Sequence, residues 1–177
     1  LLVAGAAVEA QGQQFLNDWF LDLDGAGGMP PVRITEFLDT VGPSYIRLTF
    51  NTGSVTQGTF DDFAVFNSIF HDGGAGYSGF PSHEVSAVFR GQGTFTLGGA
   101  ILFTNGTLQI YSGSPRDFAI SDGLGGFIYG ANNGRLIGEF RVVSGQGTIG
   151  VTGVPNGQIT VVLERTSLAP DVWIAPD

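Results

Sequence analysis

The chain has 177 residues, a formal net charge of −9 and no cysteine, and arginine supplies all seven of its basic residues. This length allows one domain that buries about 70% of its unfolded surface without disulfides or a structural metal. The scattered acidic residues and the missing basic patch exclude nucleic-acid binding as a main role. The absence of cysteine excludes disulfide scaffolds, thiol nucleophiles and zinc sites built on cysteine.

The first ten residues have the composition of the end of a secretory signal peptide. Leu1–Val8 is apolar and too short to span a bilayer, and Val8-Glu9-Ala10 fits the small-x-small pattern of signal peptidase cleavage. We therefore expect residues 1–10 to be a signal-peptide remnant and residues 11–177 to form a single domain. The alternative is an apolar terminal strand that adds to the sheet edge of a neighbouring copy and builds a fibre. No run of about 18 apolar residues predicts a membrane span.

Short apolar runs bounded by Gly, Pro, Asn or Asp follow one another along the rest of the chain. Residues 15–23 and 63–70 also fit a helical period loosely, so we expect at most one or two short helices. About ten short strands, with turn signals about every 8–12 residues, predict an all-β fold, an antiparallel β-sandwich or a jelly-roll-like barrel. The strand candidates outside the hairpins described next are Val32–Phe37, Tyr45–Phe50, Phe60–Phe70, Glu84–Phe89 and Val172–Ile174.

Three Asn-Gly dipeptides between apolar runs predict hairpins, because both central residues of a type I′ turn need positive φ. The turn at Asn105-Gly106 is expected to pair Phe103 with Leu108 and Ile101 with Ile110 on one face. The other two expected turns are Asn133-Gly134, which pairs Phe127 with Phe140 and Ala131 with Leu136, and Asn156-Gly157, which joins Thr148–Val154 to Gln158–Glu164.

Two segments repeat a glycine pattern fifty-four residues apart, and each is followed by a predicted hairpin. They are Gly91–Gly98 and Gly145–Thr152, and we interpret them as equivalent strand entries within one sandwich. The Gly145–Thr152 segment also matches a dinucleotide-binding glycine pattern. Because strand and turn residues follow it instead of a helix, we exclude cofactor binding there.

Asp22-x-Asp24-Gly25, with Asp18 nearby, resembles the acidic start of a calcium loop. The spacing excludes an EF-hand, since Pro31 falls where the bidentate acid belongs. Two interpretations stay open. One is a looser calcium site that uses Asp18, Asp22 and Asp24, and the other is a simple Asp-Gly turn.

We expect no catalytic residues. The only histidines, His71 and His83, are each followed by an acid, and we interpret them as turn residues in preference to zinc ligands or a general base. No Gly-x-Ser-x-Gly nucleophile motif occurs. Asp61 and Asp62 would point to opposite faces of a strand, which argues against a shared acid/base site.

The chain has fifteen phenylalanines, and because phenylalanine has no polar group, we assign most of these rings to the core. The tryptophans and tyrosines could line a glycan groove, but we expect core or rim positions for most of them. They are Trp19, Trp173, Tyr45, Tyr77, Tyr111 and Tyr129.

An ordered set of motifs across nearly the whole chain resembles secreted bacterial proteins with a PEP-CTERM sorting tail, particularly the flocculation-associated type. The motifs are Trp19–Ala26, Ile34–Asp39, Gly42–Ile46, His71–Gly74, the Gly91 and Gly145 segments, Gly106–Tyr111, Pro155–Thr160 and Leu168–Trp173.

The resemblance implies export, processing of a C-terminal tail by an exosortase, and retention outside the cell alongside exopolysaccharide. The expected function is therefore that of a non-enzymatic extracellular-matrix protein in flocculation, cell adhesion and biofilm formation. Two alternatives stay open: a carbohydrate-binding module, with or without calcium, and a fibre subunit that assembles by strand addition.

Overall fold

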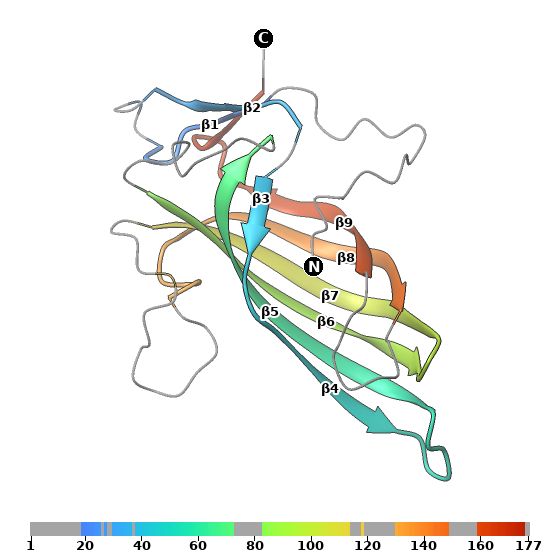
Figure 1. Ribbon diagram of the computed structural model, residues 1–177. Coiled ribbons are helices and arrows are strands. Elements are labelled where there is room, and N and C mark those ends of the chain that lie inside the picture. Colours follow the sequence, from blue (N-terminus) through green and yellow to red (C-terminus); the bar gives the residue numbers. More distant parts are fainter. Residues whose placement is uncertain are drawn as a thin grey trace.

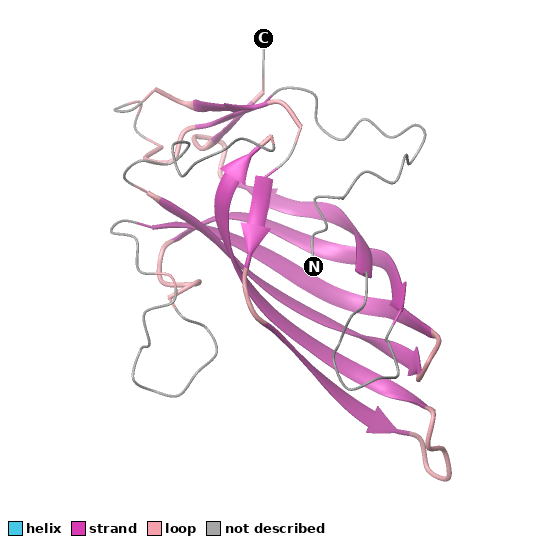
Figure 2. Cartoon of the chain, viewed as in Figure 1, coloured by secondary structure: helices cyan, strands magenta, loops and turns pink. Residues whose placement is uncertain are grey.

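In the computed structural model, the described residues form ten antiparallel strands and no helix (Figures 1 and 2). The structure describes residues 19–25, 27, 30–36, 38–72, 83–113, 118, 130–148 and 159–175. The prediction of an all-β antiparallel fold is confirmed. The strands are β1 (Trp19–Leu21), β2 (Val32–Ile34), β3 (Leu38–Val41), β4 (Ser44–Phe50), β5 (Gln57–His71), β6 (Glu84–Thr96), β7 (Ala100–Gly113), β8 (Arg135–Thr148), β9 (Ile159–Leu168) and β10 (Trp173–Ile174).

Seven strands make one large sheet in the order β3-β5-β6-β7-β8-β9, with β4 paired to β5 beside β3. Strands β3 and β4 lie end to end along the long strand β5. Between them, the Pro43 carbonyl accepts a hydrogen bond from the Val65 amide at 3.1 Å. A Cβ at Gly42 would lie only 1.8 Å from the Val65 carbonyl oxygen. Only glycine, which has no side chain, therefore fits this close approach of the backbone to β5. In Figure 1, β4 and β9 lie at opposite edges of the sheet.

The small sheet, in the order β10-β1-β2, packs on one end of the large sheet. Leu21, Ile34 and Val172 are fully buried in a cluster that also holds Val85 of β6 and Ile137 of β8. The two sheets therefore share a core, as a β-sandwich requires.

The larger core lies along one face of the seven-stranded sheet, which we call the inner face. Every second residue of a strand points to the same face, and on β5 these are Phe60, Ala64 and Phe66. Aromatic rings pack edge to face there: Phe60 and Phe103 have centroids 4.9 Å apart. The other buried members are Ala87, Phe89, Phe95, Ile101, Leu108 and Val142.

The predicted hairpin at Asn105-Gly106 is wrong, because β7 runs straight through this dipeptide. The pairing with β6 slips by one residue at Thr104, which makes a β-bulge. Phe103 and Leu108 are five positions apart and would face opposite sides of a regular strand. The extra residue returns both to the inner face, so the expected one-sided burial is observed for a different reason.

The pairing of Ala131 with Leu136 that was predicted around Asn133-Gly134 is also wrong. Ala131 is fully buried in a turn in which the Asn133 amide donates to the Gly130 carbonyl, whereas Leu136 pairs with Tyr111 of β7 and is exposed. Phe127 lies outside the described residues.

The third hairpin prediction has the wrong register: β9 is an antiparallel neighbour of β8, but it pairs with residues 138–147, with Gly147 opposite Ile159, and not with a strand that begins at Thr148. The turn at Asn156-Gly157 lies outside the described residues. Of the two segments with a loose helical period, residues 63–70 lie within β5 and residues 19–21 form β1. Strands β5, β6 and β7 are longer than predicted, since alternation continues through positions that signal turns, whereas β2 and β10 are shorter than predicted.

The repeated glycine segments lie in β6 and β8, the two neighbours of β7, and they are offset by two residues, so that Gly93 and not Gly91 is level with Gly145. Gly93, Phe103 and Gly145 lie in one row across the three strands. A Cβ at Gly91 or Gly145 would come within 2.7 and 3.0 Å of the Phe103 ring, so the missing side chains make the slot that this ring fills. Each segment begins inside its strand and includes the end of that strand, Thr96 of β6 and Thr148 of β8, so neither is a strand entry.

Candidate functional site

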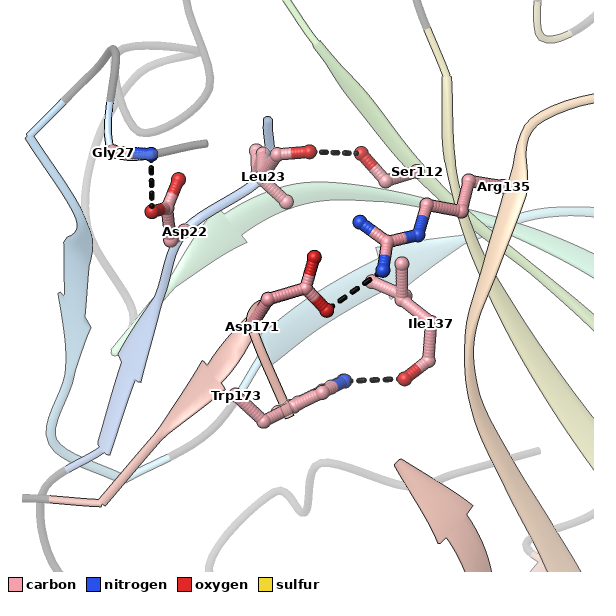
Figure 3. A network of polar contacts seen from close by, with 8 residues as sticks. All are labelled: Asp22, Leu23, Gly27, Ser112, Arg135, Ile137, Asp171 and Trp173. Atoms are coloured by element: carbon pink, nitrogen blue, oxygen red, sulfur yellow. Dashed lines mark hydrogen bonds and ion pairs between the residues drawn. The ribbon is translucent and has the colours of Figure 1, made fainter. Parts of the chain in front are cut away.

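The acidic loop after β1 forms a compact turn around Asp22 (Figure 3). The Asp22 side chain is buried, and its Oδ2 accepts a hydrogen bond from the Gly27 amide at 3.2 Å. Its Oδ1 is also buried and has no hydrogen-bond partner among the described residues, and the Asp22 carbonyl accepts from the Gly25 amide. The Asp-Gly turn is therefore present, and the calcium interpretation stays a prediction because Asp18 lies outside the described residues.

Polar contacts around this loop join the two sheets, as Figure 3 shows. Ser112 of β7 donates to the Leu23 carbonyl at 3.1 Å, and the Trp173 indole donates to the Ile137 carbonyl at 2.6 Å. Arg135 and Asp171 form an ion pair at 2.6 Å, whose hydrogen bond lowers the pKa of Asp171. These contacts make the region a structural joint.

The acids that follow the two histidines bind the backbone. Asp72 accepts the Thr35 and Glu36 amides at 2.9 and 2.6 Å, while its Oδ2 lies 3.1 Å from His71 Nδ1. Glu84 is buried and accepts the Phe118 amide at 2.7 Å. No three His, Asp or Glu side chains within the described ranges are grouped so that they could hold a metal ion. The interpretation of His71 as a turn residue is wrong, since His71 is the last residue of β5 and pairs with Leu38, and the turn conformation is that of Asp72, whose φ is +55°.

Asp61 and Asp62 point to opposite faces of β5, as predicted. Asp61 is exposed and accepts hydrogen bonds from Arg47 and from Gln92, and the Arg47 hydrogen bond holds the pKa of Asp61 below its ordinary value. Asp62 is buried on the inner face, its Oδ1 has no hydrogen-bond partner in the part of the chain that the structure describes, and this burial raises its pKa. A buried acid in an apolar row is a feature that alternation alone did not reveal.

The face opposite the inner face, which we call the outer face, carries a row of aromatic and charged side chains with one threonine between them. The row consists of residues that pair with one another across six neighbouring strands. Within it, the Arg90 guanidinium lies 4.9 Å from the centre of the Phe63 ring, a cation–π distance. Tyr45 at the start of the row is 54% exposed, and Arg141 and Glu164 at its end form an ion pair. The row, from β4 to β9, is Tyr45, Phe63, Arg90, Thr107, Arg141 and Glu164.

A second polar group lies beside this row. The Tyr111 hydroxyl donates to Gln109 at 3.1 Å, and the Gln109 amide donates to Glu139 at 3.2 Å. Partial burial and the nearby charge of Glu139 raise the pKa of Tyr111, so its hydroxyl stays protonated at neutral pH. The outer face thus offers rings, hydroxyls, an amide, guanidinium groups and carboxylates on one rigid sheet.

The aromatic residues singled out from the sequence separate into two groups. Trp19 and Trp173 stack with centroids 4.6 Å apart and pack against the core shared by the two sheets, which matches the expected core or rim role. Tyr45 and Tyr111 lie on the outer face instead. Tyr77 and Tyr129 lie outside the described residues. Because single-sequence alternation does not say which face of a sheet is covered, the sequence could not separate these groups.

Comparisons with protein-family models, with curated proteins and with solved structures find no match. In the part of the chain that the structure describes, no helix has the length and hydropathy needed to cross a membrane.

Proposed function

We propose that this protein is a non-enzymatic, polysaccharide-binding component of an extracellular matrix, and that the outer face is its binding surface. The observation that carries the proposal is the row from Tyr45 through Phe63 to Arg90 beside the Tyr111–Gln109–Glu139 group. Sugar rings stack on aromatic side chains, and their hydroxyls pair with amide and carboxylate groups fixed on a rigid scaffold.

The extracellular part of the proposal is supported by the resemblance to flocculation-associated PEP-CTERM proteins and by the signal-like residues 1–10. The acidic, lysine-free composition also suits a secreted protein that stays apart from nucleic acids. The polar groups of the outer face pair with one another: Arg47 with Asp61, Arg141 with Glu164, and Gln109 with Glu139. Such paired groups suit binding better than proton transfer.

Affinity electrophoresis through gels that contain a soluble neutral glucan or alginate would test this proposal. We expect retardation of the wild-type protein in one of the two gels and a roughly two- to tenfold weaker affinity for Tyr45→Ala, since loss of one aromatic contact costs about 0.5–1.5 kcal/mol. Phe50→Ala is the matched control, because Phe50 is an exposed ring that contacts Phe95 at the inner face. Mobility that neither polysaccharide changes would contradict the proposal.

The calcium alternative is tested in the same gels with a chelator. If Asp22 helps to bind calcium, chelation removes the retardation, and Asp22→Asn is insensitive to it. Retardation that chelator leaves unchanged would restrict the proposal to calcium-independent binding.

A further inference from the structure

The two edges of the large sheet carry matching side-chain patterns. On β4, Ile46 and Leu48 face inward and are only partly buried, and on β9 the same is true of Ile159, Val161 and Leu163. Each set packs on the main core from one side, because each strand is an outermost strand of the sheet. Phe50 ends the β4 set, 45% exposed and 5.3 Å from the Phe95 ring.

The directions of the two strands also match. Five consecutive antiparallel pairings separate β4 from β9, so the two strands run in opposite directions. A second copy that places its β4 beside β9 would therefore continue the antiparallel alternation. β9 pairs only with β8 among the described strands, and neither edge strand contains proline or lysine, two common guards against edge pairing.

One register of this pairing is favourable on both the inner and the outer face of the sheet. If Tyr45 of one copy lies opposite Glu164 of the next, all seven residues of β4 pair within β9, from Ser44 opposite Arg165 to Phe50 opposite Ile159. Inward-facing apolar residues then meet only apolar residues. These inner pairs are Ile46 with Leu163, Leu48 with Val161, and Phe50 with Ile159.

The outer side of this register is complementary in charge. Arg47 comes to lie diagonally beside Glu164 of the next copy, within the reach of long side chains across neighbouring strands. Its opposite residue is Val162, which is 43% exposed in the single chain. A register shifted by two residues would instead put Arg165 opposite the apolar Ile46.

We propose that β9 of one molecule pairs with β4 of a second copy of this chain, in the register that sets Tyr45 opposite Glu164. The contact is head to tail, so each added copy presents a new free edge, and the assembly is an open filament. It does not depend on polysaccharide binding, and it uses strands other than the terminal segment Leu1–Val8 that the sequence suggested for strand addition.

Single-cysteine cross-linking tests the register, because the natural chain has no cysteine. Thr49 and Thr160 are both exposed and would face each other between copies. We expect an oxidised mixture of Thr49→Cys and Thr160→Cys to give about tenfold more mixed disulfide dimer than a mixture of Thr49→Cys and Thr166→Cys, the ratio that a preference of about 1.4 kcal/mol produces. Thr166 is the matched control, because it lies six residues out of register, roughly 20 Å away.

Other outcomes would overturn the proposal. Dimers formed mainly from Thr160→Cys alone would indicate two-fold pairing of two β9 edges, and equal yields in the two mixtures would indicate random collision. A Thr49→Cys/Thr160→Cys double variant that forms a disulfide within one chain would show that the edges meet in one molecule.

Sedimentation of Val161→Lys gives a second test, since an inward-pointing charge on an edge strand opposes pairing. We expect this variant to lose the higher assemblies of the wild type, and their persistence would contradict the proposal. If the variant does not fold, the cross-linking yields still decide.

Discussion

Replacement of Asp62 should stabilise the protein at neutral pH. This residue is only 4% exposed and lies between Ile46 and Gly91 in the register of the inner face, and no described residue donates a hydrogen bond to its Oδ1. An unsatisfied buried acceptor costs about 1–3 kcal/mol, and more when it carries charge. We therefore expect Asp62→Leu to raise the free energy of unfolding at pH 7 by about 1–3 kcal/mol, which is roughly 2–12 °C in melting temperature for a chain of this size.

The pH dependence has a definite sign. Burial raises the pKa of Asp62 in the folded state above its ordinary value, so the folded protein binds this proton more tightly than the unfolded chain does. Stability from this group is complete below the unfolded pKa and is lost as pH rises through the folded pKa. The side-chain amide of Asp62→Asn does not titrate, so the stability of this variant should fall less than that of the wild type as pH rises above the ordinary pKa of aspartate.

Thermal unfolding of the wild type, Asp62→Leu, Asp62→Asn and Asp61→Asn between pH 3.5 and 7.5 would measure both effects. Asp61 is the matched control on the opposite face, where Arg47 lowers its pKa and the sign reverses: its contribution is lost as pH falls. An Asp62→Leu variant less stable than the wild type at pH 7, or parallel pH profiles for the wild type and Asp62→Asn, would refute the reasoning.

Three further predictions concern backbone space, the joint between the sheets and the surface charge. Gly93→Ala should destabilise by about 1–3 kcal/mol in urea unfolding, because its Cβ would lie 1.9 Å from the Leu102 carbonyl oxygen, whereas Gly99→Ala, with nothing nearer than 3.4 Å, should be close to neutral. Gly25→Ala should loosen the small sheet and change tryptophan fluorescence, since Gly25 has a φ of +62° and its Cβ would lie 2.4 Å from Asp171 Oδ2; an unchanged spectrum would be evidence against this joint. Self-association should increase with salt or with calcium, because either reduces repulsion between surfaces of net charge −9, and a constant sedimentation coefficient would contradict this.

The sequence predicted the strands because their alternation is local information. Phe60, Ala64 and Phe66 stand at even spacing, and the structure buries all three on one face of β5. The hairpin predicted from Asn105-Gly106 does not form, because pairing with strands distant in the sequence outweighs the local turn preference of the dipeptide. Strands β6 and β8 pair with β7 on both sides of the dipeptide, and a bulge at Thr104 satisfies this pairing where a turn would end it.

The candidate site was only partly accessible from the sequence. Tyr45 and Tyr111 were recognised as aromatic residues that could contact a glycan, but the row that connects Tyr45 to Arg90 depends on the register of three strands. The sequence showed that Gly91 and Gly145 repeat, but it did not show what the repeated glycines do in the fold. Only the pairing of both segments with β7 shows that they make space for one phenylalanine ring.

The filling of the inner face limits where a partner can bind. Phe103 occupies the space left by glycines on both neighbouring strands, and it packs edge to face against Phe60 and Phe89. A ligand on this part of the inner face would have to displace rings that are themselves well packed, at a cost of several kcal/mol for each aromatic side chain removed from the core. The outer face and the edge strands carry no such cost, because Tyr45 and Val162 already contact solvent. Binding on the outer face and pairing at the edges are compatible for the same reason: an added strand extends the row from Tyr45 to Glu164 without covering it.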